Sequence, residues 1–413
     1  MINFVPGLPT PLEKFLSRFD RIFSKPLKRS FRAYIAGLML GMSRCNIEAI
    51  SKKTFLTSYQ ALQYFASDSK WNPEELNTLR VSCIQETKST KSLKNGVLAI
   101  DDTGCFKYGT KTEGAQVQHY GTEDRLANCN VVVVSAYCDA HKRWPVNLRA
   151  YKPASEFLLG KEDPDFKSKI QLAQDLFDDA LEKEIEFSDV VFDAWYFADS
   201  VVQNIEAKGK TWISEADVNR RISLRGKWVR ADELVKLIPS TKFTRKVTLT
   251  NSKGKQRTFY LYGFTGKVKG LSGKKRIVIA KGSWSEDDPK KVHIFVTNHL
   301  SYNATQVILK YGMRWGIEQL FRDLKENTAF DQYQVRSLLA ITRHWHLSFL
   351  AYTFLIRYRL TGSYSKVMQR RPKTIGDCLR SYQSIQSLCS YEWISKNHDD
   401  YIVFLGFKHR KAA

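Results

Sequence analysis

Apolar residues recur along this chain with two different periods, which divide it into helical and strand-rich parts. Up to about residue 95 they return every three or four positions, the spacing of one face of a helix. The pattern predicts helices at 29–42, 46–51 and 59–65, with Ser58 as the N-cap of the third. Three short helices joined by tight turns resemble a helix-turn-helix module, although many small bundles share this pattern.

From residue 96 onward, short apolar runs bounded by polar turns replace the helical period. The runs at 97–100, 131–137 and 144–151 predict three consecutive antiparallel strands. Asp163 followed by Pro164 is typical of a helix start, with the aspartate as the cap and the proline at the first helical position.

Strands and helices continue to alternate after this helix, which indicates an α/β fold. The apolar runs predict strands at 190–192, 211–214 and 292–297, and helices at 196–208, 305–326 and 338–360. The tail to residue 413 is expected to be helical with loops.

One stretch between these elements has an unusual charge. Residues 242–281 contain 12 Lys or Arg and no Asp or Glu, and basic positions alternate with β-branched ones. This pattern predicts a β-rich insertion with a strongly positive surface. The candidates for DNA contact within it are Lys246, Lys255, Arg257, Lys274, Lys275 and Arg276.

The overall composition favours a nucleic-acid partner. Of 413 residues, 65 are Lys or Arg and 42 are Asp or Glu, so the formal net charge is +23. The charge is uneven, because residues 161–200 hold 12 acidic and 4 basic residues. Positive surfaces around an acidic segment suit DNA that must approach a carboxylate site. The hydrophobic fraction of 43% is enough for a sizeable core and excludes wholesale disorder.

The sequence predicts neither a membrane span nor a secretory signal. The longest apolar run, 347–356, is far shorter than the roughly 20 residues that a span needs. The N-terminus lacks a basic segment followed by an apolar one. The seven cysteines are odd in number and form no CxxC pair, which favours reduced thiols in the cytosol and gives no zinc site.

Four acidic residues occupy positions from which their side chains could converge. Asp101 and Asp102 end one predicted strand, Asp193 directly follows another, and Glu318 lies in a later helix. Converged carboxylates bind Mg²⁺, and two such ions can clamp the attacking and leaving oxygens of a phosphodiester. Simpler interpretations remain open: helix or turn caps for the aspartates and a solvated surface position for the glutamate.

The surroundings of Glu318 favour the functional interpretation. The pattern is Tyr311-x2-Arg314-x3-Glu318-x6-Lys325. At about 100° per residue, the four side chains fall in one stripe about 60° wide, beside the apolar face of the helix. A carboxylate flanked by cations suits a metal site with phosphate clamps. The alternative is an i,i+4 salt bridge between Arg314 and Glu318 on a solvated stripe.

This signature resembles that of the DDE transposases of the IS4-like group of bacterial insertion sequences. The stretch Ala-Ile-Asp-Asp-Thr-Gly at 99–104 resembles the strand that holds their first aspartate, and Val-Phe-Asp at 191–193 resembles the second. The basic insertion lies where that group carries one. The Ile-Asp-Asp-Thr-Gly form, with 121–129 downstream, is most similar to the IS701 branch, and the resemblance covers about residues 30–345.

The resemblance implies an RNase H-like mixed-sheet catalytic core. By position, Asp102, Asp193 and Glu318 would bind two Mg²⁺ or Mn²⁺ ions. Asp102 is preferred over Asp101 because the family's catalytic aspartate directly precedes the Thr, and strand alternation places the two on opposite faces. Tyr311, Arg314 and Lys325 would hold the DNA backbone at the transposon end.

The resemblance also implies the activity and the partners. Water would cleave the phosphodiester at the end of the element, and the freed 3′-hydroxyl would attack target DNA. The partners would be double-stranded DNA and a second copy of the chain, with no membrane and no small-molecule substrate, in the bacterial cytoplasm at the nucleoid. Trp212, Trp228 and Trp284 are candidates for stacking on an extruded base, with packing as the alternative.

Two other functions are compatible with the same residues: an RNase H-fold nuclease without strand transfer, and a non-catalytic DNA-binding protein derived from a transposase. In every case we expect the same division of the chain. It comprises a helical DNA-binding domain (1–95), a first core part (96–214), the basic insertion (215–290), a second core part with the catalytic helix (291–345) and a helical C-terminal region (346–413).

Overall fold

The computed structural model describes residues 4–109, 111–120, 125–250, 256–283, 291–361 and 372–406. Its α-helices are α1 (Thr10–Leu16), α2 (Lys25–Leu38), α3 (Ile47–Ser51), α4 (Tyr59–Ser67), α5 (Pro73–Gln85), α6 (Lys169–Glu182), α7 (Asp199–Ala207), α8 (Ala231–Leu237), α9 (Ala304–Gly312), α10 (Trp315–Thr328), α11 (Leu338–Thr361), α12 (Ile375–Lys396) and α13 (His398–Phe404). Its strands are β1 (Val97–Phe106), β2 (Ala115–Tyr120), β3 (Arg125–Cys138), β4 (Arg143–Tyr151), β5 (Asp189–Phe192), β6 (Thr211–Glu215), β7 (Arg221–Leu224), β8 (Lys227–Arg230), β9 (Arg245–Thr250), β10 (Gln256–Gly266), β11 (Lys275–Lys281) and β12 (Val292–Thr297).

Within these ranges a ten-stranded mixed sheet forms the centre of the molecule, which confirms the α/β class. Its order is β2-β3-β1-β5-β6-β12-β11-β10-β9, and β4 pairs with β3. Strands β4, β3 and β1 are antiparallel, whereas β1, β5 and β6 are parallel. Three antiparallel strands followed by two parallel ones are consistent with the expected RNase H-like core. Buried β-branched runs, such as the four valines from Val131 in β3, explain why these segments are strands.

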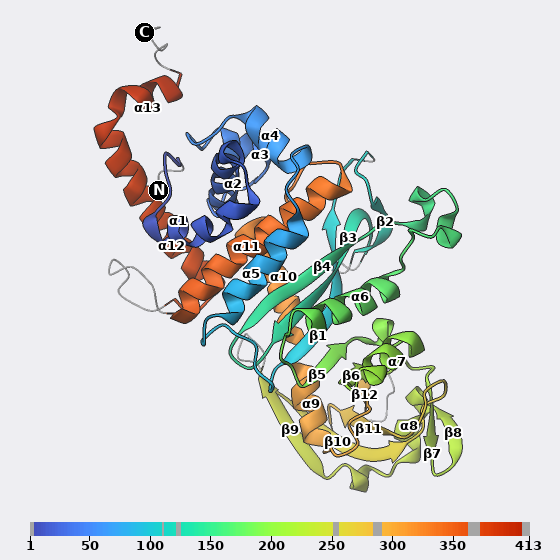
Figure 1. Cartoon of the computed structure of the whole chain (residues 1–413). Coiled ribbons are helices and arrows are strands. Elements are labelled where there is room, and N and C mark those ends of the chain that lie inside the picture. The colour runs from blue at the N-terminus through green and yellow to red at the C-terminus, as the bar shows by residue number, and fades with distance from the viewer. Residues whose placement is uncertain are drawn as a thin grey trace.

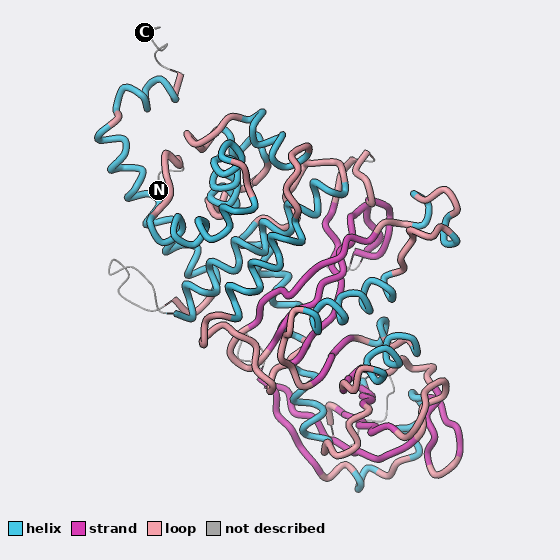
Figure 2. The backbone as a smooth tube through the Cα atoms, in the orientation of Figure 1, coloured by secondary structure: helices cyan, strands magenta, loops and turns pink. Residues whose placement is uncertain are grey.

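The basic insertion continues the same sheet. Strand β12 pairs with β6 on one side and β11 on the other, and β10 and β9 follow outward. Figure 2 shows these strands as one continuous magenta layer, while most helices gather at the other end. Strands β7 and β8 form a two-stranded sheet of their own, joined to the segment after β10 by a bridge between Ile222 and Val268. The insertion is therefore coupled to the core through backbone hydrogen bonds.

The N-terminal helices pack against the C-terminal ones. Helices α2, α4 and α5 contact α11, so the blue and orange elements lie side by side (Figure 1). In this interface the hydroxyl of Tyr34 lies 2.9 Å from Nδ1 of His344, and both side chains are buried. Residues 4–95 thus share one core with the C-terminal helices. A DNA-binding role for them stays a prediction.

One helix begins later than its sequence suggested. Helix α6 starts at Lys169, where Ser168 and Gln171 form a capping box. The carboxylate of Asp163 instead accepts a hydrogen bond from the backbone N–H of Asp165, which closes a local turn. The expected start at Asp163 and Pro164 was wrong, because the reciprocal cap five residues later satisfies more backbone donors.

The described ranges contain neither a membrane-spanning helix nor a disulfide. None of their helices is long and apolar enough to cross a membrane. The seven cysteines all lie within them, and each is a free thiol.

Candidate active site

A cavity of about 1080 Å³ opens beside the middle of β1 and the end of β5. All four carboxylates singled out in the sequence line it, although they come from three segments that are far apart in the chain: Asp101, Asp102, Asp193 and Glu318. The parallel pairing of β1 with β5 explains why the aspartates of β1 lie near Asp193. Strand β1 continues through Asp101 and Asp102 to Phe106, so the expectation that these aspartates end the strand was wrong. Because β1 and β5 are parallel neighbours, the middle of β1 lies beside the end of β5, which Asp193 directly follows.

The two neighbouring aspartates face different elements, as strand alternation requires. The carboxylate of Asp101 accepts a hydrogen bond from a guanidinium nitrogen of Arg314 at 2.8 Å. The carboxylate of Asp102 accepts one from Nζ of Lys169 at 3.0 Å and one from the hydroxyl of Tyr196 at 2.8 Å. Asp101 thus belongs to the side of α10, and Asp102 to the side of α6.

Asp193 has the capping role considered from the sequence. Its carboxylate accepts hydrogen bonds from the backbone N–H groups of Trp195 and Tyr196, which begin a 3₁₀ turn at Ala194–Tyr196. Helix α7 starts only at Asp199, later than the predicted residue 196. The cap fixes the Asp193 carboxylate at the cavity wall, so the structural role and a functional one are compatible.

The long helix expected at 305–326 is two helices. Helix α9 ends at Gly312 and α10 begins at Trp315, and the N–H of Arg314 bonds to the carbonyl of Tyr311 in a tight three-residue step. Glycine in a helix interior costs about 1 kcal/mol relative to alanine, so Gly312 is a weak point in the helical pattern. A Cβ at Gly316 would lie 2.8 Å from Sγ of Cys138, so this glycine allows α10 to approach β3 closely.

Arg314 stands at this break and connects two of the carboxylates. One guanidinium nitrogen reaches Asp101, and the other lies 2.6 Å from a carboxylate oxygen of Glu318. The i,i+4 salt bridge considered from the sequence is therefore present. The Arg314 side chain is only 12% exposed, whereas that of Glu318 is 53% exposed, so Glu318 is the carboxylate most open to solvent.

The break separates Tyr311 from the rest of the predicted stripe. Tyr311 is 5% exposed and packs on Phe295, with their ring centroids 4.6 Å apart. The guanidinium of Arg314 lies 5.7 Å from the Tyr311 ring. Lys325 lines the main cavity, and its Nζ donates to the carbonyl of Gly104 at 2.8 Å. Tyr311 is thus a buried support for Arg314 in this structure, while Lys325 is at the cavity.

Burial and crowding of charge perturb the aspartates. Burial raises the pKa of Asp101 to about 7; Arg314 opposes this shift, and Asp193 and Asp102 add to it. Burial also raises the pKa of Asp193, again against the influence of Arg314. Burial alone would lower the pKa of Arg314, but Tyr311, Asp101 and Glu318 together raise it above its ordinary value. Several carboxylates around one guanidinium are typical of a functional site.

The carboxylates at the cavity are suitable ligands for a hard divalent cation, although they are not arranged as a metal site. Carboxylate oxygens are the ligands that Mg²⁺ and Mn²⁺ prefer, and the cavity supplies them from three separate elements. Among the described residues, no three His, Cys, Asp or Glu side chains are close enough together to hold an ion. Cations occupy the carboxylates instead: Arg314 on Asp101 and Glu318, and Lys169 on Asp102.

Two residues at this cavity were missed in the sequence. Lys169 and Trp195 both line it, and the indole of Trp195 is 54% exposed. Trp195 follows Asp193 by two positions, which is a signal that could have been used. Of the tryptophans considered earlier, Trp212 is buried and donates to Glu206, so it packs, and Trp228 is half exposed on β8. Trp284 lies outside the described residues.

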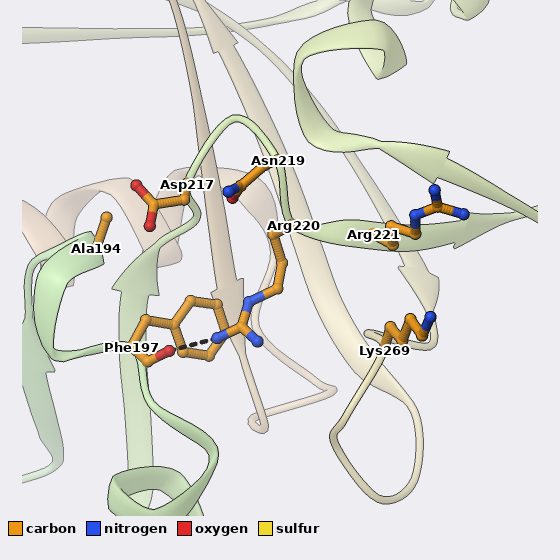
Figure 3. A pocket seen from close by; sticks show the side chains of 7 residues that line it. All are labelled: Ala194, Phe197, Asp217, Asn219, Arg220, Arg221 and Lys269. Carbon is orange, nitrogen blue, oxygen red and sulfur yellow. Dashed lines mark hydrogen bonds between the residues drawn. The ribbon is translucent and has the colours of Figure 1, made fainter.

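A second cavity, of about 460 Å³, adjoins the first. Ala194 and Phe197 line it, so the segment after Asp193 separates the two cavities. Figure 3 shows the guanidinium of Arg220 over the Phe197 ring, 4.3 Å from its centroid, with Arg221 and Lys269 beyond it. Arg220 is anchored by Asp199 and by the carbonyl of Phe197. This cavity presents positive charge beside the carboxylate site.

The cations of the insertion do not form one surface. Lys246 pairs with Tyr260 and Arg257 with Leu249 across the β9–β10 hairpin, so alternation places the two cations on opposite faces. Arg257 lies on the face that carries α9, where it lines a small cavity with Tyr311 and Arg314.

The other basic candidates differ in exposure. Lys274 is exposed and Arg276 half-buried. Lys275 is 3% exposed, and its Nζ lies 2.8 Å from a carboxylate oxygen of Glu206. This buried ion pair is incompatible with the expected DNA contact, because the ammonium cannot reach a phosphate without breaking it. Lys255 lies outside the described residues.

Comparisons with known proteins agree with the motifs. A family profile described as DDE superfamily endonuclease matches residues 18–232, and one described as Transposase DDE domain matches residues 163–354. A curated protein described as a probable transposase for insertion sequence element IS701, from Microchaete diplosiphon, is 25% identical over 249 residues. The aligned region covers 58% of this chain and 59% of that protein. The resemblance expected from the sequence is confirmed.

Proposed function

Because this chain belongs to the DDE superfamily endonucleases, we propose that it is a transposase. In this proposal it binds the terminal inverted repeats of an insertion sequence, cleaves the DNA at their ends and joins the freed ends to target DNA. Since two ends must be cut and joined together, we propose that it acts as a homodimer on DNA. The observation that carries the proposal is the convergence of Asp101, Asp102, Asp193 and Glu318 on one cavity.

We assign the metal-binding role to Asp102, Asp193 and Glu318. Two Mg²⁺ or Mn²⁺ ions held there would supply Lewis-acid activation of water and stabilisation of the leaving oxygen. Asp102 is supported over Asp101 by its exposure: its side chain is 24% exposed, against 16% for Asp101, which is occupied by Arg314. Glu318 would leave Arg314 to join the other two carboxylates.

The protein residues position the DNA. Arg314 and Lys325 are the proposed contacts to the phosphates next to the cut. The buried ring of Tyr311 packs near the Arg314 guanidinium and supports it. The reaction is two successive phosphoryl transfers. In the first, water attacks the phosphodiester and the 3′-oxygen leaves as a hydroxyl. In the second, that hydroxyl attacks a target phosphodiester and displaces another 3′-hydroxyl, so no covalent protein intermediate is needed.

The test is a joining assay with defined DNA ends. Duplexes carrying the inverted repeats that flank the gene, labelled at the transferred strand, are incubated with the protein, Mg²⁺ and supercoiled plasmid. We expect the label in plasmid DNA, and none when the repeat is scrambled. Cleavage without joining would show a nuclease without strand transfer. Specific binding without cleavage in either Mg²⁺ or Mn²⁺ would show a DNA-binding derivative.

We further propose that DNA crosses the face of the sheet that carries α9. Replacing Arg257 by alanine then removes about one phosphate contact and lowers the slope of log K against log salt by about 0.9. The matched control is Lys246→Ala, which removes one exposed cation from the opposite face of the same hairpin. Fluorescence anisotropy from 50 to 300 mM salt measures both. A larger effect for the Lys246 variant would place the DNA on the other face.

A further inference from the structure

Lys169 occupies a position that helix physics does not favour. It is the first residue of α6, where the helix dipole disfavours positive charge. The Lys169 side chain takes no part in capping the helix, because Ser168 and Gln171 form the capping box and satisfy two of the free backbone N–H groups. A lysine at this position therefore needs another explanation, and its side-chain contacts provide one.

The Lys169 side chain is directed into the main cavity. Its Nζ lies 3.0 Å from the carboxylate of Asp102, and it lies over two aromatic rings, 5.3 Å from the centroid of Trp195 and 5.6 Å from that of Tyr151. The side chain is only 19% exposed. The ammonium is thus held by one carboxylate and two aromatic faces, and both Lys169 and Trp195 line the cavity.

The neighbouring lysine behaves differently. Lys167 is 52% exposed and pairs with Asp175, another residue of the same surface. Two lysines in one short segment thus have distinct roles: one forms a surface ion pair, and the other neutralises a carboxylate of the proposed metal site. The Lys169 ammonium thus supplies, next to Asp102, the positive charge that a divalent cation would supply there.

We propose that Lys169 is a positioning residue that competes with a divalent cation for Asp102. Without the cation its ammonium neutralises and orients the carboxylate. When the cation binds, the ammonium is released from Asp102 into the cavity, where it contacts a DNA phosphate. The inference rests on the proposed function, because it takes Asp102 to be a metal ligand.

The test measures Mn²⁺ binding to the full-length protein without DNA, by electron paramagnetic resonance at constant ionic strength. Lys169→Met keeps the apolar stem and removes the charge, so we expect Mn²⁺ to bind about tenfold more tightly than to the wild type. Lys169→Arg retains a cation and should bind Mn²⁺ as the wild type does. Lys167→Met is the matched control, and its affinity should not change.

A second readout separates competition from simple structural support. In Ca²⁺, with no cleavage, the Lys169→Met protein should bind the DNA end several-fold more weakly than the wild type and with a smaller salt slope. A support role alone would lower both Mn²⁺ affinity and DNA affinity. Unchanged or weaker Mn²⁺ binding by Lys169→Met would overturn the inference, and a tighter Lys167→Met protein would show a non-specific charge effect.

The Asp193→Asn protein distinguishes a failure of the proposed metal site from a failure of the role proposed for Lys169. If it binds Mn²⁺ as tightly as the wild type does, the proposed metal site is wrong. If it loses Mn²⁺ binding while Lys169→Met binds like the wild type, the metal site stands and the role of Lys169 is refuted.

Discussion

Replacing Asp193 by asparagine or Glu318 by glutamine should reduce DNA cleavage by about 10²- to 10³-fold or more, with little loss of DNA binding. Both substitutions keep the size of the side chain and remove the charge on which a hard cation depends. Denaturing gels with a labelled terminal repeat measure cleavage, and gel shifts in Ca²⁺ measure binding. The Asp193→Asn amide retains a carbonyl oxygen for the cap, so the turn at Trp195 and Tyr196 should persist.

The same assay decides between the adjacent aspartates. Asp102→Asn should behave like the Asp193 variant, whereas Asp101→Asn should retain measurable cleavage, because Asp101 acts through Arg314. Glu326→Gln is the control: it is an exposed acid on the same cavity wall, and its loss should have little effect. An inactive Asp101 variant beside an active Asp102 variant would transfer the metal-binding role to Asp101. Normal cleavage by both the Asp193 and Glu318 variants would refute the site.

Replacing Arg314 by glutamine should destabilise the metal-free protein more at pH 8 than at pH 6. The folded-state pKa of Asp101 is about 7, above its ordinary value. The contribution of this carboxyl to the free energy of unfolding therefore falls as the pH rises from about 4 to about 7. Without Arg314 the pKa rises further, and the loss extends above pH 7. We expect a cost of about 3 kcal/mol at pH 8, because a buried carboxylate loses its cation, and roughly half of that at pH 6, where the carboxyl is protonated.

Urea unfolding at the two pH values measures this difference. The double variant Asp101→Asn with Arg314→Gln should recover most of the stability at pH 8, since no buried charge then remains unpaired. Arg322→Gln, an exposed position on α10, should change stability little at either pH. An equal loss for Arg314→Gln at both pH values would show that its packing on Tyr311, and not the charge of Asp101, accounts for the effect.

Much of the core could be predicted because its signals are local. The buried strand β12 has the bounds expected from its apolar run, and Ser58 caps α4 as its side chain suggested. The carboxylates could be identified because two of them directly follow such runs and Glu318 carries a spaced signature. The parallel pairing of β1 with β5 then brings the aspartates of these two segments close together.

Other features of the site could not be predicted, because they depend on tertiary packing, and the spacing of apolar residues carries no information about it. The break at Gly312 was missed because the apolar pattern continues through it, and it removed Tyr311 from the stripe. Lys275 looked like its basic neighbours, but Glu206, 69 residues earlier, holds it in the interior. Lys169 was overlooked because nothing near it in the sequence shows that Asp102 is its partner.

The break between α9 and α10 also has a mechanical consequence. Helix α9 packs on β9 and β10 and also on β5, β6 and β12, while α10 packs on β1, β3, β4 and the C-terminal helices. The two helices thus contact different strands of one sheet, and Arg314 lies at the joint between them. The guanidinium that holds Glu318 therefore belongs to a residue at the boundary of the two helices. A change in the angle between α9 and α10 would alter the distance from that guanidinium to the Glu318 carboxylate, so the joint sets how far Arg314 reaches.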